Sequence, residues 1–367
     1  MENKTNLIDY INWRGDLSFS QSPFNNVDAL VLNLVSFLNF ENFNIDYPLD
    51  NKINIVNLID SFFKLNPNEN RLGLIIPSEI FLIAKSIKNC NRYANIKVSN
   101  FINKIDQSSS EQFSALVFHL DKESLFVSFR GTDDTLIGWA EDVNLLAEFP
   151  VPAQKDAKDY LNKIANMYPD KSIYIGGHSK GGNLSVYASI YCDEITQGRI
   201  KEVYSFDGPG FMKNTLDEEL FNKVKDRIYH IIPNGGIVGR LFSCDIDPTI
   251  IKSYYKGLDQ HNPFSWVVER NSFKKVDAFS KNSNKIKKEI DALIEKMNDD
   301  EKKDFAKDLN QYLDSLKQNN LIEFLNLRNV MSLLSNKYKM KHKNIRYLLK
   351  LYFIFSKYDA IHVKISK

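Results

Sequence analysis

The feature that most constrains the fold is an alternation of strand-like and helix-like segments between residues 101 and 266. β-Branched and aromatic runs predict strands at residues 113–120, 125–129, 171–175, 201–206 and 227–232. Helix-like segments at residues 157–167 and 182–192 lie on either side of the third strand. This β-α-β-α-β order is typical of a mostly parallel sheet with helices on both faces. We therefore expect an α/β fold.

The segments on either side have a different character. Before residue 101 the chain is mixed, with one buried helix expected at residues 27–39. After Phe273 a charged, helix-periodic stretch covers residues 285–316, and more apolar helices are expected at residues 321–334 and 345–355. We expect a main domain over residues 1–275 and a helical C-terminal region over residues 276–367.

Composition excludes several classes of protein. The chain has 367 residues, 43% of them hydrophobic and 26% charged, which is ordinary for a globular protein and not for a disordered one. A net charge of +2 and the absence of a nucleic-acid motif give no reason to expect a nucleic-acid partner. Three widely spaced cysteines predict neither a disulfide framework nor a zinc site, and no other cluster has metal-ligand spacing. We expect no metal and no cofactor.

The ends of the chain and its apolar runs bear on location. The first residues lack the basic and apolar regions of a secretory signal. The longest apolar runs, such as residues 29–38, are too short to span a bilayer. A cytoplasmic location is the expectation.

A pentapeptide between the third predicted strand and the helix after it points to chemistry. Residues 177–181 read Gly-His-Ser-Lys-Gly, the pattern G-x-S-x-G. When this pattern ends a strand and begins a helix, the serine sits on a sharp turn, and side chains two positions on either side would collide. Backbone N–H groups at the start of the helix face developing negative charge. Ser179 is therefore the candidate nucleophile.

A serine needs a base, and the chain offers six histidines. His119 and His230 lie inside predicted strands, where buried structural roles are expected, and His178 is next to the serine on the turn. His342 and His362 lie in the basic C-terminal region. His261 lies in a loop after the last strand-like run, 82 residues after Ser179, which fits the chain order serine, acid, histidine. His261 is the candidate base.

The acid and the donors that would hold an oxyanion come from other strand ends. Asp207 directly follows the strand after the Ser179 helix and is the candidate acid, while Asp245 and Asp247 stay open as alternatives. The turn after residues 227–232 contains no carboxylate. Thr132, at the end of the second strand, and Lys180 are the candidate oxyanion donors.

Several of these motifs resemble those of known proteins. Phe129-Arg-Gly-Thr132, Trp139, Asp142 and residues 177–182 resemble class 3 lipases. More narrowly, segments across residues 5–275 resemble the Mbeg-like bacterial branch of lipase-like α/β hydrolases, whose domain is of unknown function; the segments that carry this resemblance are Asp9-Tyr10, residues 13–19, residues 23–30, residues 206–211 and residues 260–266. The resemblance implies an α/β-hydrolase fold, Ser179 as nucleophile, His261 as base, and oxyanion donors at Thr132 and Lys180. Class 3 lipases usually carry the acid after the strand that ends here at Pro233-Asn234, and this branch often has Asp where this chain has Asn262.

These observations predict a serine hydrolase that cleaves a carboxylic ester, with a lipid-like ester as the expected substrate. Two alternatives stay open: an acyltransferase with the same triad, and an inert hydrolase fold that binds a lipid or a protein partner. Residues 136–139, 145–151 and 237–242 are candidates for a cap over an acyl pocket, with plain core as the other interpretation. Residues 337–350 carry six Lys or Arg and no acidic residue, and form either a contact with anionic lipid headgroups or a solvated helix face.

Overall fold

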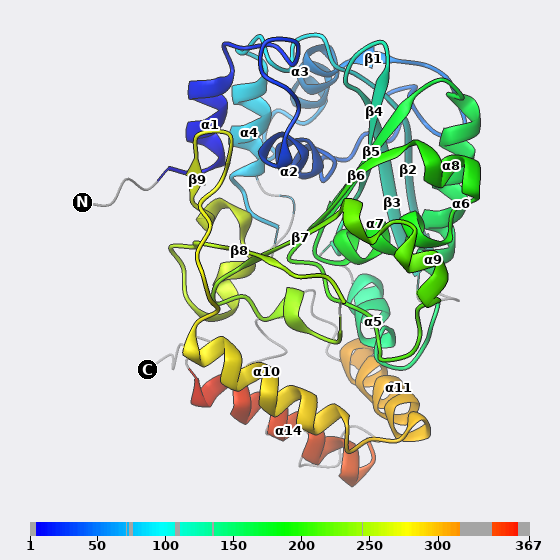
Figure 1. Cartoon of the computed structure of the whole chain (residues 1–367), viewed down its shortest axis with the longest axis vertical. Coiled ribbons are helices and arrows are strands. Elements are labelled where there is room, and N and C mark those ends of the chain that lie inside the picture. Colours follow the sequence, from blue (N-terminus) through cyan, green and yellow to red (C-terminus); the bar gives the residue numbers. More distant parts are fainter. Residues whose placement is uncertain are drawn as a thin grey trace.

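The computed structural model describes residues 5–70, 72, 76–106, 111–133, 136–243, 245–315 and 340–358. A sheet whose eight strands lie side by side in chain order forms the centre of this part of the chain (Figure 1). Its strands are β1 (Ile53–Asn54), β2 (Lys97–Asp106), β3 (Glu111–His119), β4 (Ser124–Phe129), β5 (Ser172–His178), β6 (Ile200–Phe206), β7 (Ile228–Pro233) and β8 (Thr249–Ile251). A separate hairpin pairs β9 (Val268–Glu269) with β10 (Ser272–Phe273).

The direction of the strands changes at β4. Strands β4 to β8 pair in parallel, while β1 to β4 pair antiparallel. The predicted mostly parallel sheet is confirmed, and each of the five predicted strands is present with ends that shift by a few residues. Strand β2, which extends the antiparallel part, was not predicted from the sequence.

Helices cover both faces of the sheet and, at one end, the loops that leave it (Figure 1). They are α1 (Leu7–Arg14), α2 (Asn26–Val35), α3 (Ile55–Leu65), α4 (Ile80–Ile87), α5 (Leu136–Asn144), α6 (Pro152–Met167), α7 (Lys180–Tyr191), α8 (Glu194–Arg199), α9 (Glu218–Asn222), α10 (Lys281–Ile294), α11 (Asp299–Ser315) and α14 (His342–Lys357). Short 3-10 turns are η1 (Lys225–Arg227), η2 (Val238–Arg240), η3 (Gly257–His261) and η4 (Pro263–Ser265).

Two hydrophobic cores lie on the two faces. Along β4, Phe126 packs with helices α1 to α4, whereas Leu125 and Val127 pack with α6 and α7. This alternation follows from the two-residue period of a strand. Because both faces are covered, all of β3 and β4 is buried.

The charged stretch expected at residues 285–316 forms two helices, α10 and α11. The break is explained at Asn298, whose side chain accepts the N–H of Glu301 at 2.9 Å. The Glu301 carboxylate accepts the N–H of Asn298 at 3.2 Å, which completes a capping box and begins a new helix. The helix expected at residues 321–334 lies outside the described residues, and the one at residues 345–355 lies within α14.

The C-terminal helices pack against segments that follow the strands. Helix α11 shares a hydrophobic cluster with Val143 and Leu146, in and directly after α5. Helices α10 and α14 share another with Ile237 and Leu258, which belong to the segments around η2 and η3. Figure 1 shows these helices together at one end of the sheet. They therefore cover the loops that leave strands β4 and β7.

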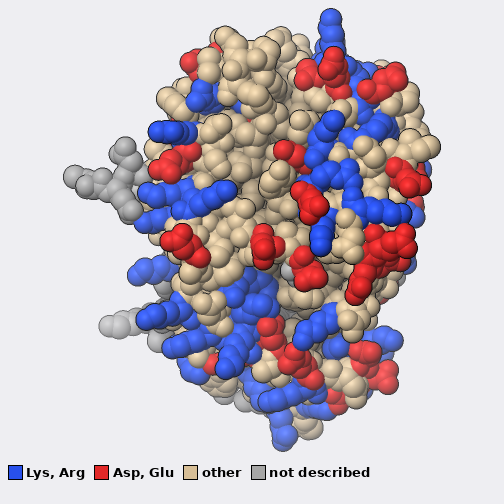
Figure 2. All heavy atoms as spheres, in the orientation of Figure 1, with Lys and Arg blue, Asp and Glu red and all other residues tan. Residues whose placement is uncertain are grey.

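The basic stretch at residues 337–350 begins outside the described residues and continues into α14. Lys341 and Lys343 form ion pairs with Asp304 and Glu301 of α11. Figure 2 shows Lys and Arg gathered toward the C-terminal helices, with acidic side chains between them. Part of the positive charge of the stretch is therefore neutralised within the chain. Along the described residues, no helix is long and apolar enough to cross a membrane.

Candidate active site

Ser179 lies at the turn between β5 and α7. Its backbone has φ 58° and ψ −131°, a region that non-glycine residues seldom adopt. The side chain is only partly buried, unlike its neighbours on both sides. Such strain at an accessible serine between a strand and a helix is typical of a nucleophile turn.

The glycines around Ser179 are required by close backbone contacts. A Cβ on Gly177 would lie 2.2 Å from the carbonyl carbon of Gly181, and a Cβ on Gly181 would lie 2.2 Å from the carbonyl oxygen of Phe129. A Cβ on Gly131 would lie 2.5 Å from the carbonyl oxygen of His178. The steric reason predicted for the motif is confirmed, and the turn after β4 packs directly on the Ser179 turn.

His261 and Asp207 are brought together. His261 Nδ1 lies 2.7 Å from Asp207 Oδ2, and the carboxylate is completely buried while about a quarter of the imidazole is exposed. The other oxygen of Asp207 accepts the N–H of Gly239 at 2.9 Å. When Nδ1 donates to this carboxylate, Nε2 is the ring nitrogen that is left for another partner. The pair has the geometry of an acid that orients a base.

The other two candidate acids lie elsewhere. Asp245 and Asp247 are both exposed at the surface. Asp207, by contrast, follows β6 directly, and its N–H donates to the carbonyl of Ile231 on the neighbouring strand β7. The sheet itself therefore fixes the carboxylate beside the loop that carries His261.

His178 connects the loop of His261 to the turn of Ser179. Its ring lies against the His261 ring, with centroids 4.4 Å apart, and its Nε2 lies 2.9 Å from the carbonyl oxygen of His261. Burial lowers the pKa of His178 well below its usual value, so this ring stays neutral and donates to that carbonyl. Among the described residues, no hydrogen bond joins the Ser179 hydroxyl to His261, whose ring lies against that of His178. The sequence did not indicate this contact between His178 and the loop of His261.

The two candidate oxyanion donors lie on the turns that touch. Lys180 is the first residue of α7, and neither its N–H nor that of Thr132 has a backbone partner among the described residues. The Thr132 hydroxyl donates to Asp142 at 2.6 Å, which fixes the turn after β4. N–H groups held in this way can bind a developing negative charge.

Burial raises the pKa of Asp142 to about 6, although the hydrogen bond from Thr132 and the positive charge of Lys180 oppose this shift. The carboxyl group therefore loses its proton near neutral pH rather than near pH 4. Above that pH the carboxylate is ionised in a buried place, which makes the folded chain less stable than it is with the proton bound.

The side chain of Lys180 enters a buried network that the sequence did not predict. Its Nζ lies 2.7 Å from Glu141 Oε2, 2.8 Å from the carbonyl oxygen of Gln112 and 3.0 Å from the Gln112 side-chain oxygen. The Lys180 and Glu141 side chains are both fully buried. Glu141 also accepts the N–H groups of Gln112 and Ala153 at 3.1 and 2.9 Å. Adjacent carboxylates of α5 therefore hold both turns, Glu141 through Lys180 and Asp142 through Thr132.

Asn33 is a second residue that the sequence did not single out. From α2 on the other face, its side-chain nitrogen donates to the carbonyl of Phe129 at 2.9 Å and to Ser128 at 2.7 Å. Its side-chain oxygen accepts the N–H of His178 at 3.0 Å. An asparagine inside an otherwise apolar helix was the available signal, because a buried amide needs partners.

The remaining histidines that the structure describes lie in other surroundings. His119 and His230 are buried within strands, as predicted, and bond to Ser99 and to the carbonyl of Gly208. His342 is exposed at the start of α14, and His362 lies outside the described residues. Among the described residues, no group of three or more His, Cys, Asp or Glu could hold a metal ion.

Comparison with known proteins gives a family and a few solved structures. The sequence model of a family described as Mbeg1-like matches residues 87–311. Among curated proteins none matches significantly. The crystal structure of M37 lipase is 14% identical, covers 59% of this chain and 70% of its own, and has a TM-score of 0.38. The crystal structure of Lip2 lipase from Yarrowia lipolytica is 12% identical, covers 69% and 86%, and has a TM-score of 0.36. The sheet, its helices on both faces and the β5–α7 turn are those of the α/β-hydrolase fold predicted from the sequence.

Proposed function

Since this chain belongs to the Mbeg1-like family, we propose that it is a serine hydrolase that cleaves a carboxylic ester with a lipid-like acyl group. The observation that carries the proposal is the buried Asp207 bonded to Nδ1 of His261, in a loop stacked on the residue before Ser179. Burying a carboxylate costs free energy unless the carboxylate is paired and hydrogen-bonded. Here the partner is the imidazole of His261, which the carboxylate orients as an acid orients a base. Acyl transfer requires a base that can reach such a strained, accessible serine, and the stacking of His261 on His178 supports this role for His261.

In the first half of the reaction, His261 Nε2 takes the proton of Ser179 as Oγ attacks the ester carbonyl. The C–O π electrons move to the oxygen, and the N–H groups of Thr132 and Lys180 stabilise this oxyanion. Asp207 stabilises the imidazolium without taking a proton. When the oxyanion collapses, the bond to the alcohol breaks, and the alkoxide leaves with the proton from His261. An acyl group is then bound to Ser179.

In the second half, water replaces the alcohol. His261 removes a proton from water as its oxygen attacks the acyl carbonyl, and the same N–H groups hold the second oxyanion. Collapse breaks the bond to Ser179 Oγ, which takes back the proton from His261. A carboxylic acid is released and the enzyme is restored. An alcohol or amine in place of water would give acyl transfer with the same residues.

The first test is covalent labelling by a fluorophosphonate, which reacts with activated serines. We expect the wild type to be labelled and to hydrolyse p-nitrophenyl esters, and Ser179→Ala to lose both. Ser172→Ala is a matched control, because Ser172 begins β5, the strand that ends at the Ser179 turn, and is only partly buried. No labelling of the folded wild type would refute the proposal. Analysis of products with added alcohol separates hydrolysis from acyl transfer.

A further inference from the structure

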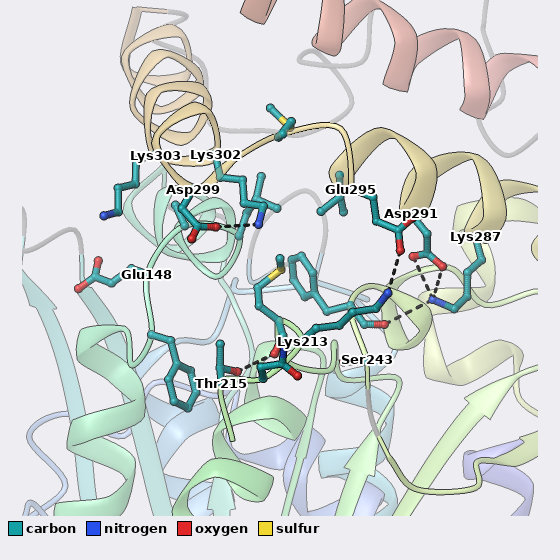
Figure 3. Close-up of a pocket in the computed structure, with 18 residues that line it drawn as sticks. Glu148, Lys213, Thr215, Ser243, Lys287, Asp291, Glu295, Asp299, Lys302 and Lys303 are labelled. Atoms are coloured by element: carbon teal, nitrogen blue, oxygen red, sulfur yellow. Dashed lines mark hydrogen bonds and ion pairs between the residues drawn. The ribbon is translucent and has the colours of Figure 1, made fainter. Parts of the chain in front are cut away.

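A cavity of about 560 Å³ lies between the loops that leave the sheet and helices α10 and α11 (Figure 3). Its volume is within the range of about 300–1,000 Å³ that is usual for ligand pockets. Three segments of the main domain and two of the helical region contribute to its lining. The contributing residues lie within 146–149, 212–215 and 242–243, and within 287–297 and 299–303.

The walls from the main domain continue segments of the candidate active site. Residues 146–149 follow α5, whose carboxylates hold the turns of Thr132 and Lys180. Residues 212–215 begin five residues after Asp207. Residues 242–243 follow η2, where Gly239 donates to Asp207. The two segments pair with each other, since Phe211 and Ser243 exchange backbone hydrogen bonds at 2.8 and 2.9 Å.

The chemistry of the lining favours an uncharged chain. Apolar side chains come from four of the five segments; they are Leu146, Phe149, Met212, Phe242, Ile294 and Met297. Four lysines and four carboxylates also line the cavity, so that their formal charges cancel. Figure 3 shows most of these charges bonded to each other, as in Lys213–Glu295, Lys287–Asp291 and Lys302–Asp299. A polyanion such as a nucleotide would meet as many negative charges as positive ones.

Backbone conformation sets this wall apart from ordinary core. Phe242 has φ 62°, in the left-handed region that a bulky side chain rarely adopts. Strain of this kind persists where the surrounding structure holds it, and it is concentrated at binding sites.

We propose that this cavity binds the acyl chain of the ester that Ser179 attacks, which makes the substrate a medium- or long-chain acyl ester. The inference rests on the proposed function. Two of the three segments that the sequence suggested for an acyl pocket, residues 145–151 and 237–242, contribute to the lining. In the third, at residues 136–139, most of the side chains lie outside the described structure. The helical region is then part of the substrate site, because α10 and α11 form its outer wall.

Two substitutions fill the cavity from opposite sides. Ala147→Trp adds bulk from the main domain, and Ile294→Trp adds bulk from α10. Ala292→Trp is the matched control, since Ala292 is exposed on the same helix and does not line the cavity. Substrates are p-nitrophenyl acetate and p-nitrophenyl decanoate. Both filling variants should lower kcat/KM for decanoate by roughly tenfold or more, because a few methylene groups of the acyl chain would no longer be buried. The kcat/KM for acetate should be nearly unchanged. The control should keep the wild-type ratio.

If both filling variants keep the wild-type ratio of kcat/KM for decanoate to kcat/KM for acetate, and Ser179 is still labelled, the acyl cavity is refuted. The proposed hydrolase activity would not be affected by that result. A second measurement does not depend on catalysis. Binding of dodecanoate to Ser179→Ala, measured by calorimetry, should be weakened about tenfold by either filling substitution and unaffected by Ala292→Trp. The inference would be overturned if neither substitution changes the affinity for dodecanoate, or if dodecanoate does not bind at all. Binding that responds to them in a wild type that is not labelled would retain the cavity and refute the hydrolase.

Discussion

Removing the ammonium group of Lys180 tests how the turn that carries Ser179 is held. The Lys180 Nζ makes three hydrogen bonds in a site with no solvent access, and one of them is an ion pair with Glu141 at 2.7 Å. Lys180→Met keeps most of the side-chain volume and the backbone N–H. It leaves the Glu141 carboxylate buried without its counter-charge, although that carboxylate still accepts two backbone N–H groups.

The magnitude follows from this geometry. Removing one partner of a buried ion pair costs about 3–5 kcal/mol, which is a large share of the roughly 5–15 kcal/mol that stabilises a typical domain. Glu141→Gln in the same chain removes the unpaired charge and keeps a carbonyl oxygen as acceptor. The double variant should therefore recover about half or more of the free energy of unfolding lost by Lys180→Met alone.

The assay is urea unfolding of the wild type, both single variants and the double variant, read as a double-mutant cycle. Lys223→Met is the control, because Lys223 pairs with Glu219 across one helical turn at the surface at 3.5 Å. That exposed pair should be worth less than about 1 kcal/mol. A loss below about 1 kcal/mol for Lys180→Met, or losses that simply add in the double variant, would refute the buried-pair argument.

Three further outcomes follow. Asp207→Asn should lower kcat/KM on p-nitrophenyl esters by about 10³–10⁴-fold, because it loses the charge that orients and stabilises His261; a change under about tenfold would contradict this role. For Asp142, the folded pKa of about 6 lies above the unfolded value of 3.8, so the folded chain binds the extra proton and its stability falls as pH rises from 4 to 6. Asp142→Asn should therefore stabilise the protein by up to about 3 kcal/mol at pH 8 and hardly at pH 4, and an equal gain at both pH values in thermal unfolding would refute it. Asn33→Leu leaves the His178 N–H and the Phe129 carbonyl unpaired and should cost about 2–4 kcal/mol of unfolding free energy in urea; a neutral result would show that these contacts carry little.

The turn around Ser179 could be predicted because its requirements are local. The glycines at 177 and 181 are needed by backbone atoms within a few residues and by the end of the neighbouring strand. The order of strands carries Asp207 and His261 to the same edge, so their positions in the chain were sufficient to name both as candidates, with Asp245 and Asp247 still open as alternative acids. The residue that separates Asp207 from its alternatives is Gly239, 32 positions away. Nothing in the spacing of the three aspartates shows which one a distant N–H will meet.

The network behind the turn could not be predicted for the same reason. Lys180 and Glu141 are 39 residues apart, and Asn33 and His178 are 145 apart. Each polar group could have been suspected from its apolar surroundings, but its partner is chosen by the packing of helices on the sheet. The break at Asn298 was different, because the Asn-x-x-Glu capping pattern is present in the sequence and required no tertiary information.

The C-terminal helices bear most directly on how the site works. The sequence predicted a boundary at residue 275, and that division stays a prediction. The match to the Mbeg1-like family extends to residue 311, through α10 and most of α11. Helix α11 packs on α5, which holds the turns of Thr132 and Lys180, and α10 packs beside η2, which donates to Asp207. If these helices were an independent appendage, loosening them would leave the chemistry at Ser179 intact. Their contacts argue the opposite. Helix α11 packs on α5, and Leu258, in the 3-10 turn that carries His261, packs with α10 and α14.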